Sequence, residues 1–420
     1  MTAGIVTVYA APAVVPVTAP AIRDGAVAVA GDRIVAVGPH AEVRRAHPVA
    51  DVIELEGVIT PGLVNAHTHL QFTSFAVVGR DPFPSYVRWA ERFVEEHGTR
   101  RDEDWRATAL DGVAAGLSSG TTCFGDVVTN RQAMDVLVTA GVAGVAYFEI
   151  IGTDEARWTA GIEAEVVEVL SSTPTTAVSR VGLAPHAPYS VTPAALRAAA
   201  ALARRLGVRL HSHVAEVDSE DEFYRTGTGP WADRVRAVVA RPWPILDDGG
   251  TGRGVVDLAA DTGLLGPDCH LAHGVYLDRA GRASLAAAGT AVALCPRSNL
   301  TVGSAPPPVA DYLRERVPFC VGTDSLGSNR SLDLLEDVAL LRRLALDGGY
   351  DEPDLDYRLL AAATIDGARA LGLDDCVGSL TVGKRADLAE FAVDPVDAVG
   401  NVVRAGAGRC QATYTAGHPR

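Results

Sequence analysis

Two kinds of hydrophobic pattern divide this chain. In residues 1–56, short runs of alternating apolar and polar positions such as "GAVAVAGDRIVAVG" are broken by Gly, Pro and Asp, which predicts a small antiparallel sheet. The tail from Val377, "VGSLTVGKRADLAEF", has the same texture. We therefore predict a small β-sandwich built jointly by residues 1–56 and 377–420, and a separate domain formed by residues 57–376.

The middle segment alternates apolar strands with helices rich in Ala, Leu and Arg. One helix is expected to open at "TPAALRAAAALARRLG", with Thr192 as its cap and Pro193 in its first turn. Alternation of this kind, repeated eight times, predicts an α/β fold of the (β/α)8 TIM-barrel type, with functional groups at the C-terminal ends of the strands. The strand candidates are "VITPGLVNAHTH", "TTCFGDVV", "GVAYFEII", "VGLAPHAP", "RLHSHVAE", "HLAHGVYL", "AVALCPRSN" and "PFCVGTDS".

Two connections in this segment are longer than the usual βα loops. They cover about 71–105 and 217–253. Long connections in compact domains are often functional. We regard the second as a candidate substrate lid.

Composition narrows the classes of partner. The chain has 420 residues, a formal net charge of -15 and no basic face of the kind that binds phosphates, so we expect neither nucleic acid nor membrane as a partner. The N-terminus lacks a basic start, and no apolar run approaches the ~20 residues that span a bilayer. The six cysteines are scattered without a CxxC pair. We expect a cytoplasmic protein in a reducing compartment.

A pair of histidines carries the first chemical signal. His67 and His69 in "VNAHTHLQF" are two residues apart, so on a strand their side chains point to the same face. An HxH pair alone is weak, because two core or solvated histidines give the same pattern. Imidazole nitrogens and carboxylates from several strand ends make the set that a divalent metal of the zinc kind prefers. The predicted ligands are His67, His69, His213, His273 and Asp324.

Other polar groups at the strand ends suggest acid and base roles. Glu216 lies three residues beyond His213, where it can reach over a metal and carry a proton, although a solvated carboxylate is the alternative. Asp324 can accept a proton from metal-bound water. His186 in "APHAPYS" faces the same mouth, where it can hold the attacking group or the substrate, or simply pack. For His211 we favour a supporting role over direct ligation, and His270 is predicted to be a core residue.

Lysine usage bears on the number of metals. Lys384, in the tail module, is the only lysine of the chain. A lysine that bridges two metals after taking up CO2 is therefore excluded. The sequence predicts one divalent metal per chain, with a carboxylate or cysteine bridge as the residual alternative.

The chain resembles the amidohydrolase superfamily, in its mononuclear deaminase and chlorohydrolase branch. The resemblance covers nearly the whole length and implies zinc, or iron as the alternative, held by His67, His69, His213 and Asp324, with His273 near the metal or its water and Glu216 as proton shuttle. The implied reaction is hydrolytic deamination of a cyclic amidine by a metal-bound hydroxide. The motifs are "PGLVNAHTHL", "SGTTCFGD", "APHAPYS", "HSHVAE", "LAHGVYLD", "LCPRSNLTVG", "GTDSLGSNRSLDLLED" and "GSLTVGKRADL".

The substrate implied by the resemblance is a nitrogen heterocycle. "CPRSN", "GTDSLGSN" and "SLDLLED" are similar to aminodeoxyfutalosine deaminases of menaquinone biosynthesis, and less so to S-adenosylhomocysteine and methylthioadenosine deaminases. Arg297 would meet a substrate carboxylate, unless it is a structural arginine. Gln71 takes the place of an acid that often holds ribose hydroxyls in relatives, and we predict that it still hydrogen-bonds the substrate there. Tyr276 takes the place of a second histidine. Guanine or cytosine deamination, triazine chlorohydrolysis and an inactive metal-binding relative stay open, and we expect a homodimer.

Overall fold

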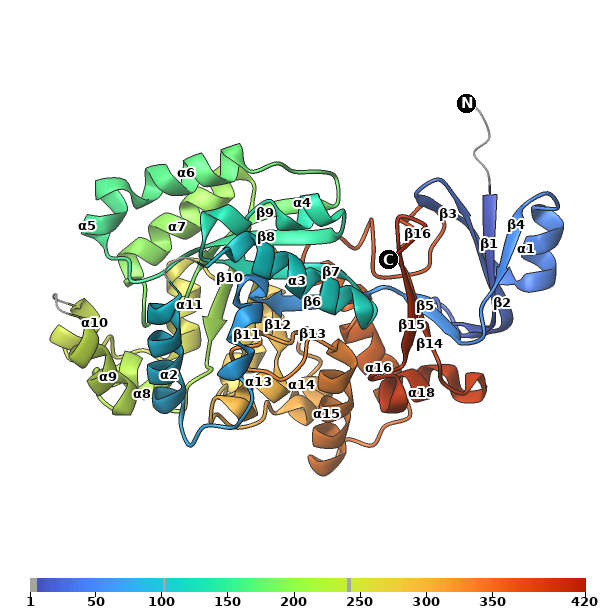
Figure 1. Ribbon diagram of the computed structural model, residues 1–420. Helices are drawn as coiled ribbons and strands as arrows, with labels where there is room; N and C mark the ends of the chain where they lie inside the picture. The colour runs from blue at the N-terminus through green and yellow to red at the C-terminus, as the bar shows by residue number, and fades with distance from the viewer. Residues whose placement is uncertain (1–5, 101–102, 240–242) are drawn as a thin grey trace.

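The computed structural model of the protein describes residues 6–100, 103–239 and 243–420. Two sheets organise it, one closed into a barrel and one built from both ends of the chain. The barrel lies on the left of Figure 1 and the terminal sheet on the right, beside the C-terminus. Among the described residues, no helix is both long and apolar enough to cross a membrane.

The barrel consists of eight parallel strands that neighbour one another in chain order. Each of the eight apolar runs contains one of them, which confirms the predicted (β/α)8 barrel. The first run, however, holds two strands, because β5 (Val58–Pro61) joins the terminal sheet before the barrel begins at β6. The barrel strands are β6 (Leu63–Thr68), β7 (Thr121–Val128), β8 (Ala143–Ile150), β9 (Ser179–Pro185), β10 (Arg209–Val214), β11 (Cys269–His273), β12 (Ala291–Leu294) and β13 (Phe319–Val321).

Helices follow the strands and cover the outside of the barrel (Figure 1). The predicted helix α7 runs from Pro193 to Leu206 after Thr192 and stops at Gly207, whose φ of 68° suits glycine. The other helices between consecutive strands are α3 (Trp105–Ser118), α4 (Val136–Ala140), α5 (Glu155–Arg157), α6 (Glu163–Ser172), α11 (Val255–Thr262), α12 (Arg279–Ala288), α13 (Pro296–Thr301) and α14 (Val309–Glu315); α15 (Leu334–Asp347), α16 (Leu355–Ala362) and α17 (Ile365–Ala370) follow β13.

The two long connections contain short helices joined by turns. The first holds the 3-10 helix η1 (Leu70–Val77) and α2 (Tyr86–Thr99). The second holds α8 (Glu220–Thr226), α9 (Pro230–Val238) and α10 (Pro244–Asp247). Helices α2 and α9 contact each other, so the helices of the two connections form one group, at the lower left of Figure 1. The role of 217–253 as a moving lid stays a prediction.

The terminal sheet is mixed rather than purely antiparallel. β1 pairs antiparallel with β2 but parallel with β4 and β5, which corrects the all-antiparallel expectation. The parallel pairing arises because α1 (His40–Ala46) connects β3 to β4. A helix between two strands carries the chain back along the sheet, so β4 runs in the same direction as β3 and β1. The strands are β1 (Val6–Val14), β2 (Ile22–Ala30), β3 (Arg33–Pro39), β4 (Asp51–Glu54), β5, β14 (Leu388–Phe391), β15 (Cys410–Thr415) and β16 (His418–Pro419), with α18 (Ala398–Ala405) between β14 and β15.

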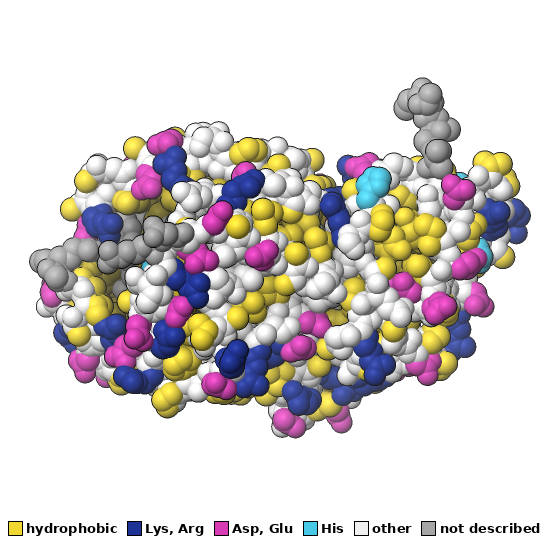
Figure 2. Space-filling view, viewed as in Figure 1, with side chains coloured by type: hydrophobic (Ala, Val, Ile, Leu, Met, Phe, Trp, Pro, Cys, Tyr) yellow, Lys and Arg dark blue, Asp and Glu magenta, His cyan; other side chains and the backbone are white. Residues whose placement is uncertain are grey.

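Alternation along β2 explains how this sheet buries both faces. Val27 and Val29 join the cluster shared with Leu388 and Tyr414 of the C-terminal strands. The intervening alanines pack beneath Val43 of α1. The two chain ends thus share one core, while the exact division at residues 56/57 and 376/377 stays a prediction. On the face shown in Figure 2, basic and acidic side chains are interspersed.

A buried side chain and a backbone hydrogen bond join the two ends of the barrel sheet. The Nδ2 of Asn65 on β6 donates to Thr323 Oγ1 (2.7 Å), and the Thr323 N–H donates to Asn65 Oδ1 (3.1 Å). One residue further on, the N–H of Asp324 donates to the His67 carbonyl at 3.0 Å. These bonds join the last strand to the first and fix the relative position of His67 and Asp324.

Asn65→Ala should lower the free energy of unfolding by about 1–3 kcal/mol, because it removes both bonds and leaves the buried Thr323 N–H without its acceptor. Urea denaturation followed by circular dichroism measures the change. Asn401→Ala removes a comparable amide bond at the surface, to the Asp394 carbonyl, and should change stability by less than about 0.5 kcal/mol. Equal losses in the two variants would contradict the closing role of Asn65.

Candidate active site

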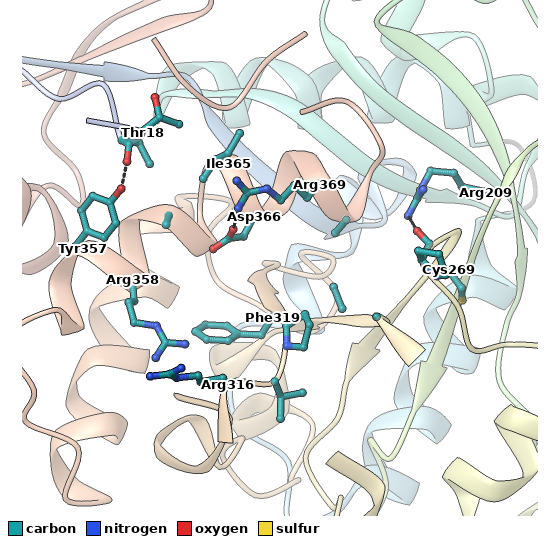
Figure 3. A pocket seen from close by; sticks show the side chains of 18 residues that line it. Thr18, Arg209, Cys269, Arg316, Phe319, Tyr357, Arg358, Ile365, Asp366 and Arg369 are labelled. Atoms are coloured by element: carbon teal, nitrogen blue, oxygen red, sulfur yellow. Dashed lines mark hydrogen bonds and ion pairs between the residues drawn. The ribbon is translucent and has the colours of Figure 1, made fainter. Parts of the chain in front are cut away.

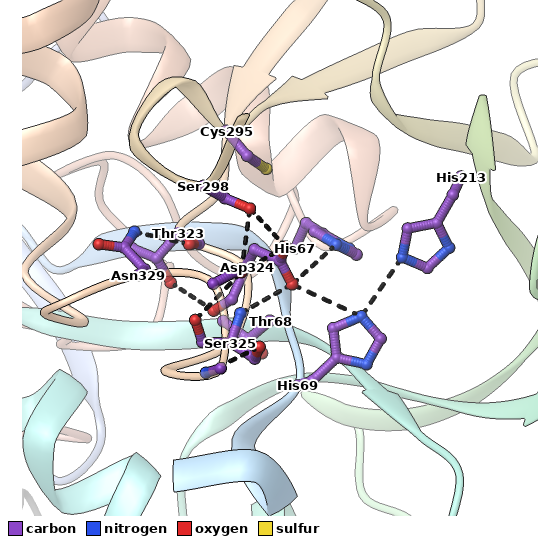
Figure 4. A network of polar contacts seen from close by, with 12 residues as sticks. His67, Thr68, His69, His213, Cys295, Ser298, Thr323, Asp324, Ser325 and Asn329 are labelled. Carbon is purple, nitrogen blue, oxygen red and sulfur yellow. Dashed lines mark hydrogen bonds and ion pairs between the residues drawn. The ribbon is translucent and has the colours of Figure 1, made fainter. Parts of the chain in front are cut away.

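The predicted ligands come together above the C-terminal ends of four strands. His67 and His69 come from the end of β6, His213 from β10, His273 from β11, and Asp324 follows β13. Ligand atoms of two overlapping triads, His67–His69–His213 and His67–His273–Asp324, lie within 4.8 Å of one another in each triad. All five side chains are buried. Figure 4 shows His67, His69 and His213 pointing toward the Asp324 carboxylate.

A chain of hydrogen bonds fixes the tautomer of His67. The Nδ1–H of His211 donates to the His270 carbonyl at 2.9 Å, because a carbonyl can only accept. The Nε2 of a neutral His211 is then an acceptor, and the Nδ1–H of His67 donates to it at 2.7 Å. The Nε2 of His67 therefore presents a lone pair and has no hydrogen-bond partner among the described residues. His211 therefore orients the ring of His67. The rings of His211 and His270 stack on each other, with their centroids 4.1 Å apart.

His213 is oriented in the same manner. Its Nδ1–H donates to the His186 carbonyl at 2.9 Å, so its Nε2 also carries a lone pair. That nitrogen lies 3.3 Å from the Nε2 of His69. Two nitrogens at this distance need either a shared proton or a cation between them.

Protonation is disfavoured at these histidines. Burial lowers the pKa of His67 well below the usual range of histidine, and the neighbouring histidines lower it further. Burial also lowers the pKa of His69 to about 4, against the opposing charge of Asp324, and lowers that of His213. Neutral imidazoles with converging lone pairs are the donor set of a divalent cation, so these residues fit a metal.

Asp324 is held as an anion. Its Oδ2 accepts from Ser298 (2.6 Å) and Ser328 (2.8 Å), and its Oδ1 accepts from the Ser325 N–H at 2.7 Å (Figure 4). The same Oδ1 lies 3.6 Å from His67 Nε2 and 3.7 Å from His69 Nε2. Burial raises the pKa of Asp324, but the histidines and Ser298 together bring it below its usual value. A carboxylate is therefore present at the point where the histidine lone pairs meet.

His273 stands between the ligand set and Glu216. Its Nδ1 lies 3.1 Å from Asn299 Nδ2, and its Nε2 lies 3.5 Å from Glu216 Oε1. With the amide N–H of Asn299 as donor, the ring proton is on Nε2 and faces Glu216. The rotated amide of Asn299 would instead free Nε2 as a ligand.

The environment of Glu216 favours its protonated form. Burial raises its pKa well above the usual value, and the charges of Asp324 and Glu220 add to this, against a hydrogen bond from Tyr86. The loop that carries it is fixed by Glu220, whose carboxylate accepts from the N–H groups of Ala215 (3.0 Å) and Glu216 (2.8 Å). The cavity lining thus holds two carboxyl groups whose pKa values are shifted in opposite directions.

His186 follows β9 and also lines the cavity. Ser190 donates its hydroxyl hydrogen to the Ala187 carbonyl at 3.0 Å. The Nδ1–H of His186 therefore donates to Ser190 Oγ at 2.7 Å, and its Nε2 is the free acceptor. This orientation suits a contact with substrate.

A cavity of ≈ 350 Å³ opens over these groups. Its wall from η1 and α2 is aromatic, with Phe72, Tyr86, Trp89 and Phe93, and His97 lies on the same helix. Glu149 from the end of β8 is a further acid in the lining, with a pKa that burial raises to about 7. The cavity therefore combines a polar floor with an aromatic side, which suits a flat heterocycle.

Two predicted substrate contacts lie outside this lining. Gln71 is buried, and its Oε1 accepts from the Asn130 N–H at 3.0 Å. Arg297 binds Asp337 through Nε (3.0 Å) and Nη2 (2.8 Å), and also pairs with Glu336. For Arg297 these contacts agree with the structural alternative.

A second, larger cavity of ≈ 740 Å³ lies at the opposite end of the barrel. Its lining includes Arg209, Cys269, Ala291 and Phe319, which stand at the N-terminal ends of their strands (Figure 3). None of the predicted site residues lines it. Active groups of this fold lie at the other end, so volume alone does not locate the site.

Sequence reasoning missed Glu149, Glu220 and the aromatic wall. Glu149 had a usable signal, because it is the one charge inside the apolar run "GVAYFEII", and buried charges are rare without a purpose. Glu220 lies in the acidic stretch "DSEDE", which is typical of an exposed helix start. Only the tertiary structure shows that its carboxylate is buried.

Comparison with known proteins agrees with this geometry. The profile of the amidohydrolase family matches residues 58–415, and that of a bacterial imidazolonepropionase-like composite domain matches residues 25–48. The fold and site define a barrel hydrolase with a metal-type donor set. The chain belongs to the amidohydrolase family.

Individual relatives are similar over most of the chain. A 5-methylthioadenosine/S-adenosylhomocysteine deaminase of Moorella thermoacetica is 32% identical over 385 residues, covering 89% of this chain and 83% of the relative. An aminodeoxyfutalosine deaminase of Deinococcus radiodurans is 31% identical over 370 residues, covering 82% and 80%. The crystal structure of an adenosine deaminase from Xanthomonas campestris with bound zinc has a TM-score of 0.81, 26% identity and coverage of 99% and 93%.

His67→Ala and His213→Ala should each weaken divalent metal binding by at least ~100-fold, because even residues behind a metal ligand contribute 10–100-fold. Metal content after dialysis, measured by elemental analysis, checks this. His418→Ala, at an exposed position, serves as the matched control and should keep wild-type content. A full metal complement in either ligand variant would refute the assignment.

Proposed function

We propose that this protein removes the exocyclic amino group of a 6-aminopurine nucleoside by hydrolysis and releases ammonia. The observation that carries the proposal is that Glu216, whose pKa is raised, and Asp324, whose pKa is lowered, line one cavity together with ring nitrogens of His69 and His213, next to the Nε2 of His67. The relatives named as deaminases support it. The general class is hydrolysis of a C–N bond in a cyclic amidine.

We assign one divalent cation per chain to His67, His69, His213 and Asp324, with His273 beside it. Zinc is proposed and iron is the alternative. When bound, such a cation supplies a polarised water whose pKa falls toward ~7. Every other role belongs to side chains of the chain itself.

Glu216 begins the reaction by donating its proton to the ring nitrogen next to the amino-bearing carbon. That proton makes the carbon electrophilic without forming a free anion. Water then adds to the carbon and gives one proton to Asp324. The carbon now carries one hydroxyl and one amino group.

Breakdown of this adduct completes the reaction and returns both carboxyl groups to their starting protonation states. Asp324 passes its proton to the amino nitrogen, the C–N bond breaks and ammonia leaves. The hydroxyl proton returns to Glu216 as the carbonyl forms. His273 holds Glu216 or the added oxygen, and the free Nε2 of His186 orients the substrate.

The particular substrate that we propose first is 6-amino-6-deoxyfutalosine, which would place the protein in menaquinone biosynthesis. The motifs shared with aminodeoxyfutalosine deaminases support it, as does the aromatic wall of α2, which suits an aromatic distal group. Methylthioadenosine or S-adenosylhomocysteine is the second candidate. The contacts of Arg297 favour it, because that guanidinium is bound to Asp337 and Glu336 and is not free for a substrate carboxylate.

Glu216→Gln should lower kcat by at least ~100-fold, since the amide cannot supply the first proton. Ammonia release under saturating substrate measures it. Metal content should stay at the wild-type level, and Glu165→Gln, at an exposed position of α6, should keep wild-type turnover. Unchanged turnover in Glu216→Gln would reject the acid role.

A substrate panel should separate the two candidates. The protein is expected to release ammonia from 6-amino-6-deoxyfutalosine with the highest kcat/KM, ahead of methylthioadenosine, S-adenosylhomocysteine and adenosine. A higher kcat/KM for methylthioadenosine would favour the second candidate. Activity on guanine, cytosine or a chlorotriazine, without activity on any 6-aminopurine nucleoside, would overturn the proposed function.

A further inference from the structure

Glu149 is a cavity acid that the reaction above does not use. It lies near the end of β8, is 7% exposed and lines the cavity. Its Oε2 accepts from the Thr129 hydroxyl at 2.7 Å. Its Oε1 is buried and has no hydrogen-bond partner among the described residues. A buried carboxylate oxygen without a donor is costly, so the feature calls for a ligand that brings one.

The location of Glu149 places that ligand next to the reacting ring. One carboxylate oxygen of Glu149 lies within 4.8 Å of ligand atoms of His186 and His213. The Nε2 of His213 faces His69, so it belongs to the donor set of the proposed metal. Glu149 thus lies next to His186 and to one ligand of the proposed metal, His213.

A dedicated support holds Glu149 in this position. Thr129, its partner, directly follows β7, and the N–H of the next residue, Asn130, donates to Gln71 Oε1 at 3.0 Å. Gln71 therefore anchors the short segment that carries Thr129. The side chain of Gln71 acts through this segment rather than by lining the cavity.

Two other polar groups of the lining are already engaged. The Tyr86 hydroxyl pairs with that of Tyr189 at 3.1 Å, and Ser325 Oγ accepts from the Gly327 N–H. The wall opposite is aromatic. Besides the Nε2 of His186, Glu149 Oε1 is therefore an acceptor that is free for donors on the non-reacting part of a substrate.

We propose that Glu149 accepts hydrogen bonds from the vicinal hydroxyls of the substrate's sugar and so selects ribonucleosides over free bases and deoxysugars. The inference rests on the proposed function, because the sugar hydroxyls are donors that every candidate nucleoside shares next to its ring. Burial raises the pKa of Glu149 to about 7, so its charged form is accessible near neutral pH. In that form the carboxylate only accepts hydrogen bonds, which matches a diol. Gln71 and Thr129 are positioning residues for this contact.

Binding of reaction products tests the contact without turnover. Calorimetry on the metal-loaded protein should show inosine binding about 10- to 150-fold more tightly than 2′,3′-dideoxyinosine, the range expected for hydrogen bonds to a charged group. In Glu149→Gln this preference should shrink to within about 3-fold. Thr129→Val, which removes the supporting hydroxyl, should reduce the preference partly, and Glu165→Gln should retain it. A preference that survives in Glu149→Gln, or none in the wild type, would overturn the inference.

Kinetics separates this contact from a structural role and from the proposed function. Glu149→Gln should raise KM for adenosine by about 10-fold or more with kcat nearly unchanged, and should change kcat/KM for 2′,3′-dideoxyadenosine by less than about 3-fold. Equal losses on both substrates would indicate a structural role. If the wild type prefers the diol through Glu149 yet deaminates no nucleoside, the proposed function fails while the sugar contact stands.

Discussion

The candidate metal site requires that no histidine N–H points at the position where the ligand atoms converge. His67 points its Nε2 lone pair at Asp324 because its other nitrogen donates to His211, which in turn donates to the His270 carbonyl. Burial reinforces the arrangement by lowering the pKa of these imidazoles. Were any link reversed, an N–H would point into the donor set and the set would no longer suit a cation. The barrel core below the site therefore controls the chemistry above it.

The two carboxylates of the floor show how environment divides acid from base. Asp324 receives hydrogen bonds from two serine hydroxyls and a backbone N–H and faces histidines, so its charge is stabilised. Glu216 is about equally buried but has another buried acid, Glu220, in its own loop. Similar burial thus gives opposite shifts in pKa, because hydrogen-bond donors and neighbouring charge differ.

Much of this architecture could be predicted from sequence, for local reasons. The two-residue period of a strand puts His67 and His69 on one face, and apolar runs separated by amphipathic helices give the eight barrel units. The contacts of Arg297, Gln71, Glu149 and Glu220 could not be predicted in the same way. Each depends on which element packs opposite: Arg297 meets Asp337 of α15, and Gln71 meets the segment after β7. Periodicity predicts the face of a residue but not its partner.

Backbone conformation at the strand ends shows where function overrides local preference. Ala215, His273 and Asp324 have φ values of 55°, 76° and 61°, in the left-handed region where non-glycine residues cost roughly 1–3 kcal/mol each. Glycine would relieve the cost at all three positions, yet at His273 and Asp324 the side chain is the reason for the position. The turn of the chain at Ala215 aims the following Glu216 back over the cavity, while Glu220 holds the loop by its N–H groups. The closing bonds between Asn65 and Thr323, next to Asp324, offset part of the strain at that end, so the stability of the barrel and the position of the base depend on the same contacts.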